Sequence, residues 1–199
     1  MYDQVLWFTT RGSGAVSLLM LTASVCFGLV TVARFAHEQW PRFLNLEMHR
    51  RVSLLAIVFL VVHVLAAVLD PFAKLGLAAA IVPLASTYRP LPVALGVVSM
   101  YLFIALIVTG LLRARMPQPL WRLIHWTSYA MWPLAVLHSV LSGSDAVAPW
   151  MLAIDAVCFA LVGLCLVWRV SVADSNRNRL EDVVLTSSWQ KPSDRKDRR

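Results

Sequence analysis

The sequence predicts an all-α integral membrane protein, a polytopic bundle of five transmembrane helices with one short interfacial or re-entrant helix. Composition is the first reason: the 199 residues are 59% hydrophobic and 15% charged, with a mean hydropathy of +0.68. A soluble domain of this size could not bury so much apolar surface. The other two reasons are the length of the apolar stretches and the uneven placement of the arginines.

Five apolar stretches are long enough to cross a bilayer, which takes about 20 residues of helix. They are 13–35, 51–69, 91–112, 121–141 and 149–168. Segment 71–87 is shorter, contains Lys74 and is interrupted by Pro83, so we expect it at the interface or re-entering the membrane. The connections are too short for another folded unit. We therefore expect one membrane domain over 11–170 and a basic, loosely ordered cytoplasmic tail over 171–199, with one short helix near its middle.

The basic residues set the expected orientation, because cytoplasmic loops collect Lys and Arg. With the N-terminus outside, the outer side holds only Arg11, Lys74 and Arg89. The inner side then holds the basic tail and Arg34, Arg42, Arg50, Arg51, Arg113, Arg115, Arg122 and Arg169. This predicts a multi-pass protein of the inner (plasma) membrane with its C-terminus in the cytoplasm. The net charge of +7 is a topology signal, and nucleic acid is not an expected partner.

Four histidines occur as two pairs on two of the expected spans. His49 and His63 are 14 residues apart, and His125 and His138 are 13 apart. At 1.5 Å per residue these pairs cover about 21 and 20 Å of helix. The two spans run in the same direction, so His49 should level with His125 near the cytoplasmic face and His63 with His138 near the outer face. Ionisable residues inside a bilayer are functional candidates, and neutral imidazole is a ligand for haem iron.

Each level could therefore hold one non-covalent b-type haem between two helices; the sequence contains no C-x-x-C-H for covalent attachment. Helical rotation fits one pair better, since a 14-residue step is about 40° off one face and a 13-residue step about 140° off. Pro133 removes a hydrogen bond to the Tyr129 carbonyl and should kink the helix between His125 and His138. The sequence leaves open whether that kink supplies the rotation. Three residues between the levels should pack in the core or bridge the electron path: Tyr129, Met131 and Trp132.

Other readings of the same residues remain open. A single histidine in a span often only hydrogen-bonds a neighbouring helix, and His37 has no partner at its depth, so we expect it at the interface. A metal-ion transporter would need midplane carboxylates or thiols, and among carboxylates the spans contain only Asp155. The cysteines, interpreted as packing residues, are Cys26, Cys158 and Cys165. A membrane anchor subunit with one structural haem is the remaining alternative.

The spacing of the two histidine pairs resembles the ferric reductase-like transmembrane domain superfamily. That superfamily includes NADPH oxidases, ferric reductases and the haem-binding subunit of bacterial methionine sulfoxide reductase, and the resemblance covers about 11–170. The sequences LDPF at 69–72, YRPL at 88–91 and SGSD at 142–145 are similar to small stand-alone bacterial members. The resemblance implies that the axial ligands of two haem irons are His49, His63, His125 and His138.

The chain departs from the larger members in two ways. Those usually have six spans, and the span before residue 13 is absent here. They also carry flavin and nicotinamide domains after the last span, whereas about 30 residues follow here without a dinucleotide fingerprint. The resemblance therefore implies an electron-transfer component of an oxidoreductase. Its donor would be a cytoplasmic flavoprotein reductase or a quinone, with any flavin held by the partner, and its acceptor an extracytoplasmic protein or a ferric chelate.

Arginines beside the expected haem levels have two possible roles. Arg50, Arg51 and Arg122 adjoin the inner histidines and could neutralise haem propionates, or could be ordinary positive-inside residues. Arg89 is the sequence's candidate for the outer propionates or for an anionic acceptor.

Overall fold

A computed structural model of the protein describes residues 2–32, 41–71, 75–143 and 147–189, with side chains described in these ranges except at 2–3, 42 and 175–189. The described residues form helices and connecting turns, with no strand among them. The helices are α1 (Tyr2–Val32), α2 (Arg42–Leu69), α3 (Gly76–Ile81), α4 (Pro90–Leu111), the 3-10 turn η1 (Arg113–Arg115), α5 (Gln118–His125), α6 (Ser128–Ser142) and α7 (Pro149–Trp189). His37 lies outside the described residues.

The prediction of an all-α membrane bundle is confirmed. Within the described residues, four helices are long and apolar enough to cross a membrane, in α1, α2, α4 and α7: Gln4–Val32, Phe43–Leu69, Pro90–Leu111 and Pro149–Asp174. The count of five spanning helices is not confirmed. The remaining expected span, 121–141, is divided between the short α5 and the 15-residue α6.

The break between α5 and α6 lies at Trp126 and Thr127. The Thr127 amide donates to the Ile124 carbonyl at 3.0 Å, and the Thr127 hydroxyl donates to the same carbonyl at 2.7 Å. Such short-range bonds compete with the regular helical ladder and tighten the chain into a turn. The kink was expected at Pro133, but Pro133 lies inside α6 and the helix is interrupted before it. Local bonding by Thr127 therefore supplies the change of direction that the histidine spacing requires.

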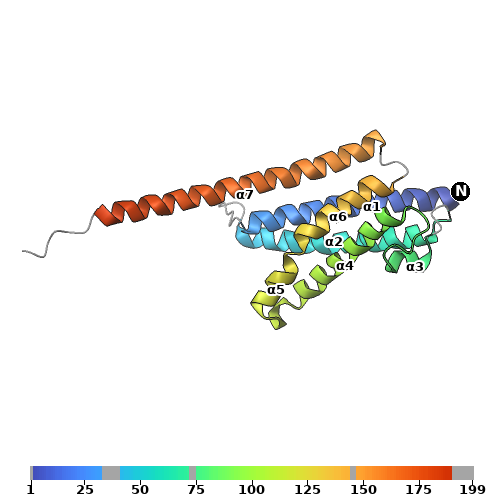
Figure 1. The fold of residues 1–199 in the computed structure, drawn as a ribbon, viewed down its shortest axis with the longest axis horizontal. Coiled ribbons are helices and arrows are strands. Elements are labelled where there is room, and N and C mark those ends of the chain that lie inside the picture. Colours follow the sequence, from blue (N-terminus) through green and yellow to red (C-terminus); the bar gives the residue numbers. More distant parts are fainter. Residues whose placement is uncertain (1, 33–40, 72–74, 144–146, 190–199) are drawn as a thin grey trace, which may run out of the picture.

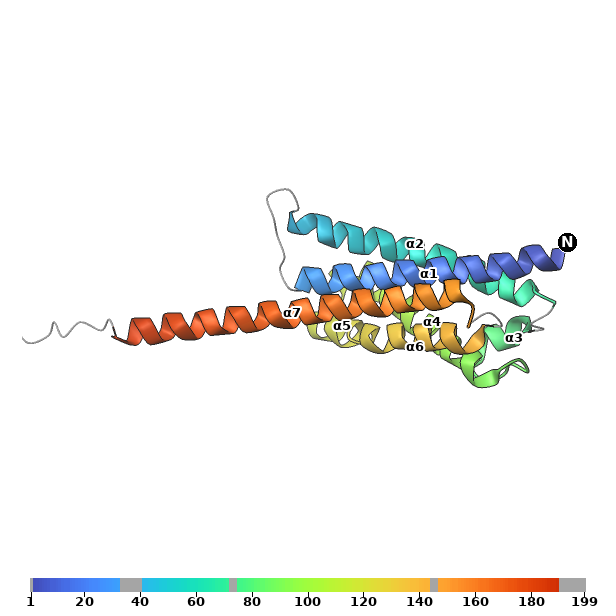
Figure 2. The same cartoon turned by 90° about the horizontal axis from the view of Figure 1, so that it is seen from above.

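The bundle is built from two helix pairs with a space between them. α1 packs along α2, and α4 packs along α6, whereas α2 touches α4 only slightly. α7 lies mainly against α1 (Figures 1 and 2). The indole of Trp132 on α6 donates to the Thr22 hydroxyl on α1 at 3.0 Å, which ties the two pairs together at mid-height. Around this bond lies a buried core that includes Leu18, Leu21, Ala56, Phe103, Met131 and Val136.

Segment 71–87 contains one short helix in its described part, the six-residue α3, so the expectation that it does not span the membrane is met. α3 contacts α2 and α4 at the end of the bundle where α1 begins (Figure 1). α7 continues as one helix to Trp189, where the sequence suggested a loosely ordered tail with a short helix. The start of α1 and the far end of α7 lie at opposite ends of the molecule (Figure 1).

Candidate functional site: two opposed histidine pairs

The four histidines meet in the two pairs that their depth predicts. The ring centroids of His63 on α2 and His138 on α6 are 6.2 Å apart, and those of His49 on α2 and His125 on α5 are also 6.2 Å apart. In each pair the ring planes are close to perpendicular, at 82° and 73°. Each pair thus bridges the space between α2 and the α5–α6 segment.

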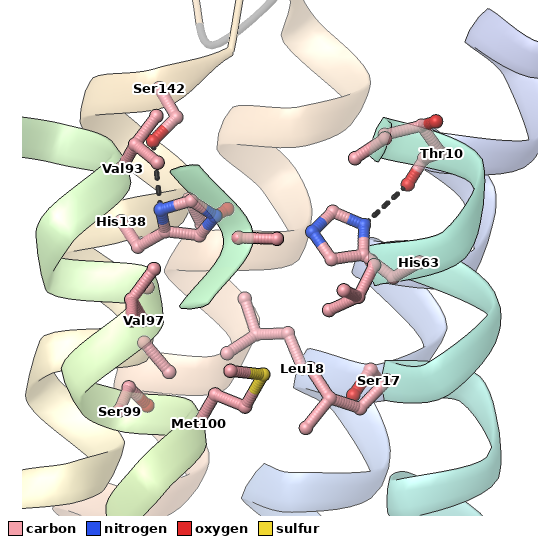
Figure 3. A pocket seen from close by; sticks show the side chains of 18 of the residues that line it. Thr10, Ser17, Leu18, His63, Val93, Val97, Ser99, Met100, His138 and Ser142 are labelled. Atoms are coloured by element: carbon pink, nitrogen blue, oxygen red, sulfur yellow. Dashed lines mark hydrogen bonds between the residues drawn. The ribbon is translucent and has the colours of Figure 1, made fainter. Parts of the chain in front are cut away.

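The outer pair is held by backbone carbonyls on both sides. The Nδ1–H of His63 donates to the Thr10 carbonyl of α1 at 2.8 Å, and that of His138 donates to the Pro92 carbonyl of α4 at 2.8 Å. The Ser142 hydroxyl lies 2.9 Å from the same nitrogen of His138. Figure 3 shows the two rings pointing toward one another across the pocket. With Nδ1 occupied, each imidazole presents Nε2 to the space between the helices.

A cavity of about 220 Å³ surrounds the outer pair. Its walls are mostly apolar and come from α1, α2, α4 and α6, including Leu18, Val64, Val97, Met100 and Ala135 (Figure 3). Arg11 and Asp70 contribute the charged groups of the lining. The Arg11 guanidinium also lies over the Trp7 ring, 5.6 Å from its centroid. The cavity is therefore a dry, flat-sided space with an imidazole at each end and a cation at its rim.

The inner pair is held well on one side. His49 Nδ1–H donates to the Ser24 carbonyl at 2.8 Å, and the Ser24 hydroxyl lies 3.2 Å from the same nitrogen. The Ser24 and Ser53 hydroxyls are 2.6 Å apart, and Ser53 donates to the His49 carbonyl at 2.7 Å. These bonds form a closed loop between α1 and α2 that fixes the ring of His49.

The other inner ligand candidate, His125, is held by ring stacking. Its ring stacks on Trp121 with centroids 4.8 Å apart and planes at 18°, and the Arg113 guanidinium lies 4.4 Å from the Trp121 ring centroid on that tryptophan. Within the described residues, the buried Nδ1 of His125 has no hydrogen-bond partner. The inner pair is thus asymmetric, with one imidazole fixed by the backbone and one by an aromatic neighbour.

The spacing of both pairs fits two imidazoles on opposite sides of one metal ion. A metal–imidazole nitrogen bond is about 2 Å and the ring centre lies about 1.1 Å further back, which places the centroids about 6.2 Å apart. The described residues contain no group of three or more His, Cys, Asp or Glu side chains arranged to hold a metal. A bare zinc ion needs about four protein ligands. Haem brings four porphyrin nitrogens of its own, so it needs only the two imidazoles that each level provides.

The arginines occupy different places from those the sequence suggested. Arg51 is exposed and its Nε donates to Glu47 at 2.6 Å, while Arg50 and Arg122 are exposed beside the inner pair. Arg89 adopts a left-handed backbone conformation, with φ 42°, and its guanidinium donates to the Leu141 carbonyl at 2.7 Å. Arg89 therefore stabilises the C-terminal end of α6.

Sequence reasoning gave Arg11 no role in the site, and it did not find the backbone carbonyls that hold the histidines. No local motif marks a carbonyl acceptor. Met131 and Trp132, the expected residues between the levels, are buried core residues, whereas Tyr129 is exposed and accepts a hydrogen bond from Arg169 at 2.8 Å.

Residues 13–141 match a protein family described as "Ferric reductase like transmembrane component". The matched range begins in α1 and ends in α6, so it contains all four histidines. Comparison with curated proteins and with solved structures gave no match.

Proposed function

The chain belongs to the ferric reductase-like transmembrane family, and from that premise we propose that it carries electrons across a membrane as a di-haem cytochrome b. The observation that supports the proposal most is the pair of opposed imidazoles, repeated at two levels with the same 6.2 Å separation. A chance hydrogen-bonding histidine would not be expected to face a second imidazole at metal-bridging distance, and still less to do so twice.

Haem iron, when bound, supplies one-electron redox chemistry in which both axial positions are filled by imidazole. The chain's own residues prepare the sites. The carbonyls of Thr10, Ser24 and Pro92 keep a proton on Nδ1 of three histidines, so that Nε2 carries the free lone pair. The apolar walls of the outer cavity exclude water, and Arg11 provides a positive charge for an anionic carboxylate.

We further propose that the protein lies in the plasma membrane with its N-terminus outside and that electrons move outward. The membrane domain would be 11–170 and the cytoplasmic tail 171–199. The inner pair, His49 and His125, would face a cytoplasmic flavoprotein reductase or a quinone. The outer pair, His63 and His138, would face an extracytoplasmic acceptor protein or a ferric chelate. The arginine distribution supports this orientation.

The count of bound haems tests the proposal directly. The full-length protein, purified from cells with ample haem, should give a b-type reduced-minus-oxidised spectrum and close to two haems per chain in a pyridine haemochrome assay. One haem per chain would favour an anchor subunit with a single structural haem. Absence of haem would overturn the cytochrome proposal. A metal-ion transporter finds no support in the described residues, because no cluster of metal-ligating side chains accompanies the histidines.

Direction requires sealed vesicles in which the chain is oriented with its C-terminal tail in the lumen. With reductant inside and an impermeant ferric acceptor outside, the wild type should reduce the acceptor. The His63→Ala variant serves as the matched control, because it lacks one outer ligand and should not transfer. Transfer by wild type only from outside to inside would overturn the proposed direction.

A further inference from the structure

Three of the four histidines share a local arrangement. In each case Nδ1–H donates to a backbone carbonyl of a neighbouring helix at 2.8 Å, and a glycine follows that carbonyl four residues later in the same helix. The arrangement occurs twice on α1 and once on α4. The three sets are His63 with Thr10 and Gly14, His49 with Ser24 and Gly28, and His138 with Pro92 and Gly96.

The glycines lie against the imidazole rings. A Cβ at Gly96 would come within 2.6 Å of His138 Nδ1, and a Cβ at Gly14 within 2.8 Å of His63 Nδ1. Both distances are shorter than any real Cβ contact, so an alanine there would displace the ring. At Gly28 the nearest atom of His49 would be 3.6 Å from the Cβ, an ordinary contact.

Helix geometry explains why the glycine stands four residues after the carbonyl. The carbonyl of residue i points along the helix axis toward residue i+4, whose Cβ lies beside it and shields it from a neighbouring helix. Without that Cβ, an imidazole can approach and share the carbonyl with the helical N–H. Glycine inside a helix costs about 1 kcal/mol relative to alanine, so its presence at these positions calls for a reason.

Two other glycines provide an internal contrast. Gly110 follows Gly96 by 14 residues, as Gly28 follows Gly14, yet a Cβ at Gly110 would meet nothing within 4 Å. The histidine at that level on the same side is His125, the one whose Nδ1 lacks a partner among the described residues. Gly12, one turn side away from Gly14 on α1, also faces open space. Contact between glycine and imidazole thus accompanies the carbonyl bond.

We infer that Gly14, Gly28 and Gly96 are positioning residues for the haem ligands: each uncovers a backbone carbonyl that orients its histidine and holds the proton on Nδ1. The inference rests on the proposed function. A carbonyl acceptor at Nδ1 makes the imidazole a stronger donor to the metal, which favours the oxidised iron. The glycines therefore act on the reduction potential as well as on the geometry of each site.

The test is a series of glycine-to-alanine substitutions in the full-length protein, with Gly12→Ala as the matched control on the same helix. Haem content, the reduction potential of each haem and the ferric EPR spectrum, which reports imidazole orientation, are measured. Gly96→Ala and Gly14→Ala should raise the potential of the outer haem and lower its occupancy. Gly28→Ala should shift only the inner haem, and less. Gly12→Ala should match the wild type. Equal effects of Gly12→Ala and Gly14→Ala, or no shift in any variant, would overturn the inference.

Haem-free protein separates this inference from the proposed function. If the wild type binds no haem, proton and nitrogen NMR of labelled histidine still reports the Nδ1–H bonds. Gly14→Ala should then lose the protected Nδ1–H signal of His63 and keep that of His49, while Gly12→Ala keeps both. Should Gly96→Ala fail to accumulate, the comparison of Gly14→Ala and Gly28→Ala with Gly12→Ala decides the matter, and retention of all signals would overturn the inference.

Discussion

The outer and inner histidine pairs have the same ring separation but are supported differently. Both outer imidazoles donate to carbonyls of long helices, α1 and α4, and line an enclosed cavity. At the inner level only His49 has such a bond. His125 ends the eight-residue α5, which contacts little besides α4, and its ring rests on Trp121. The outer site is therefore built into the bundle, whereas half of the inner site depends on a short peripheral helix.

This difference teaches that matched distances do not imply matched rigidity. A ligand held by a hydrogen bond to a buried helix moves only with that helix, while a ligand at a helix end follows local fraying. If both sites hold haem, the outer one should be more tightly bound and less variable in its ligand geometry. Four changes, ordered here by expected effect, probe this asymmetry.

The largest effect is expected from removing an outer ligand. His63→Ala or His138→Ala should reduce the haem content from about two to about one per chain, because each level draws one imidazole from each side of the bundle. Pyridine haemochrome assays with potentiometric titration would identify the haem that remains as the inner one. Loss of both haems from a chain that still folds, as judged by gel filtration and circular dichroism, would show that the two levels are not independent.

Stepwise denaturation should release the inner haem first. The α5 segment has few packing contacts to oppose local opening, so His125 should detach before the outer ligands do. Optical spectra during a denaturant titration, read against the single-haem spectrum of His63→Ala, would resolve the two losses. Release of the outer haem first, or of both together, would contradict the proposed asymmetry.

A smaller effect is expected at the stacking partner of His125. Trp121→Leu removes a stacked pair, an interaction of about 0.5–1.5 kcal/mol, so the inner haem should bind about 2- to 10-fold more weakly. Haem transfer to an apo-globin acceptor measures this loss. Trp126→Leu is the matched control, since Trp126 lies on the same segment and is 69% exposed. Equal weakening in the two variants would mean that the segment, and not the stack, supports His125.

The smallest effect is expected at Ser142. Its hydroxyl shares His138 Nδ1 with the Pro92 carbonyl, so Ser142→Ala leaves the main acceptor in place. Removing one such neutral bond costs about 0.5–1.5 kcal/mol at most, and outer haem occupancy should stay near that of the wild type. A potential shift as large as that of Gly96→Ala would show that the hydroxyl, and not the carbonyl, controls this histidine.

The sequence predicted the pairing of the histidines but not the way they are held. Pairing followed from position along parallel helices, which 1.5 Å per residue fixes to within a turn. The interruption at Thr127 was placed wrongly, at Pro133, because proline is an obvious helix breaker while a threonine bonding to its own backbone is not. Sequence patterns locate breaks through residue type, and here local hydrogen bonding decided.

The supports of the site were invisible in the sequence for a related reason. The carbonyls of Thr10, Ser24 and Pro92 belong to the backbone, which is the same at every position. Only the glycines four residues later carry a signal in residue type, and that signal emerges when the 14-residue interval between Gly14 and Gly28 is set beside the interval between His49 and His63. Arg11 was missed because it stands before the first predicted span, whereas α1 begins at Tyr2 and places Arg11 on the cavity wall.

One helix, α1, supplies the acceptors for both ligands on α2, and this sets a tolerance on chain length. Inserting a single residue in α1 between Gly14 and Ser24 would turn the two acceptors about 100° relative to each other and leave one histidine without a carbonyl. A single insertion in α2 between His49 and His63 would do the same from the other side. The two helices can therefore change length only together, with paired insertions that keep their intervals equal.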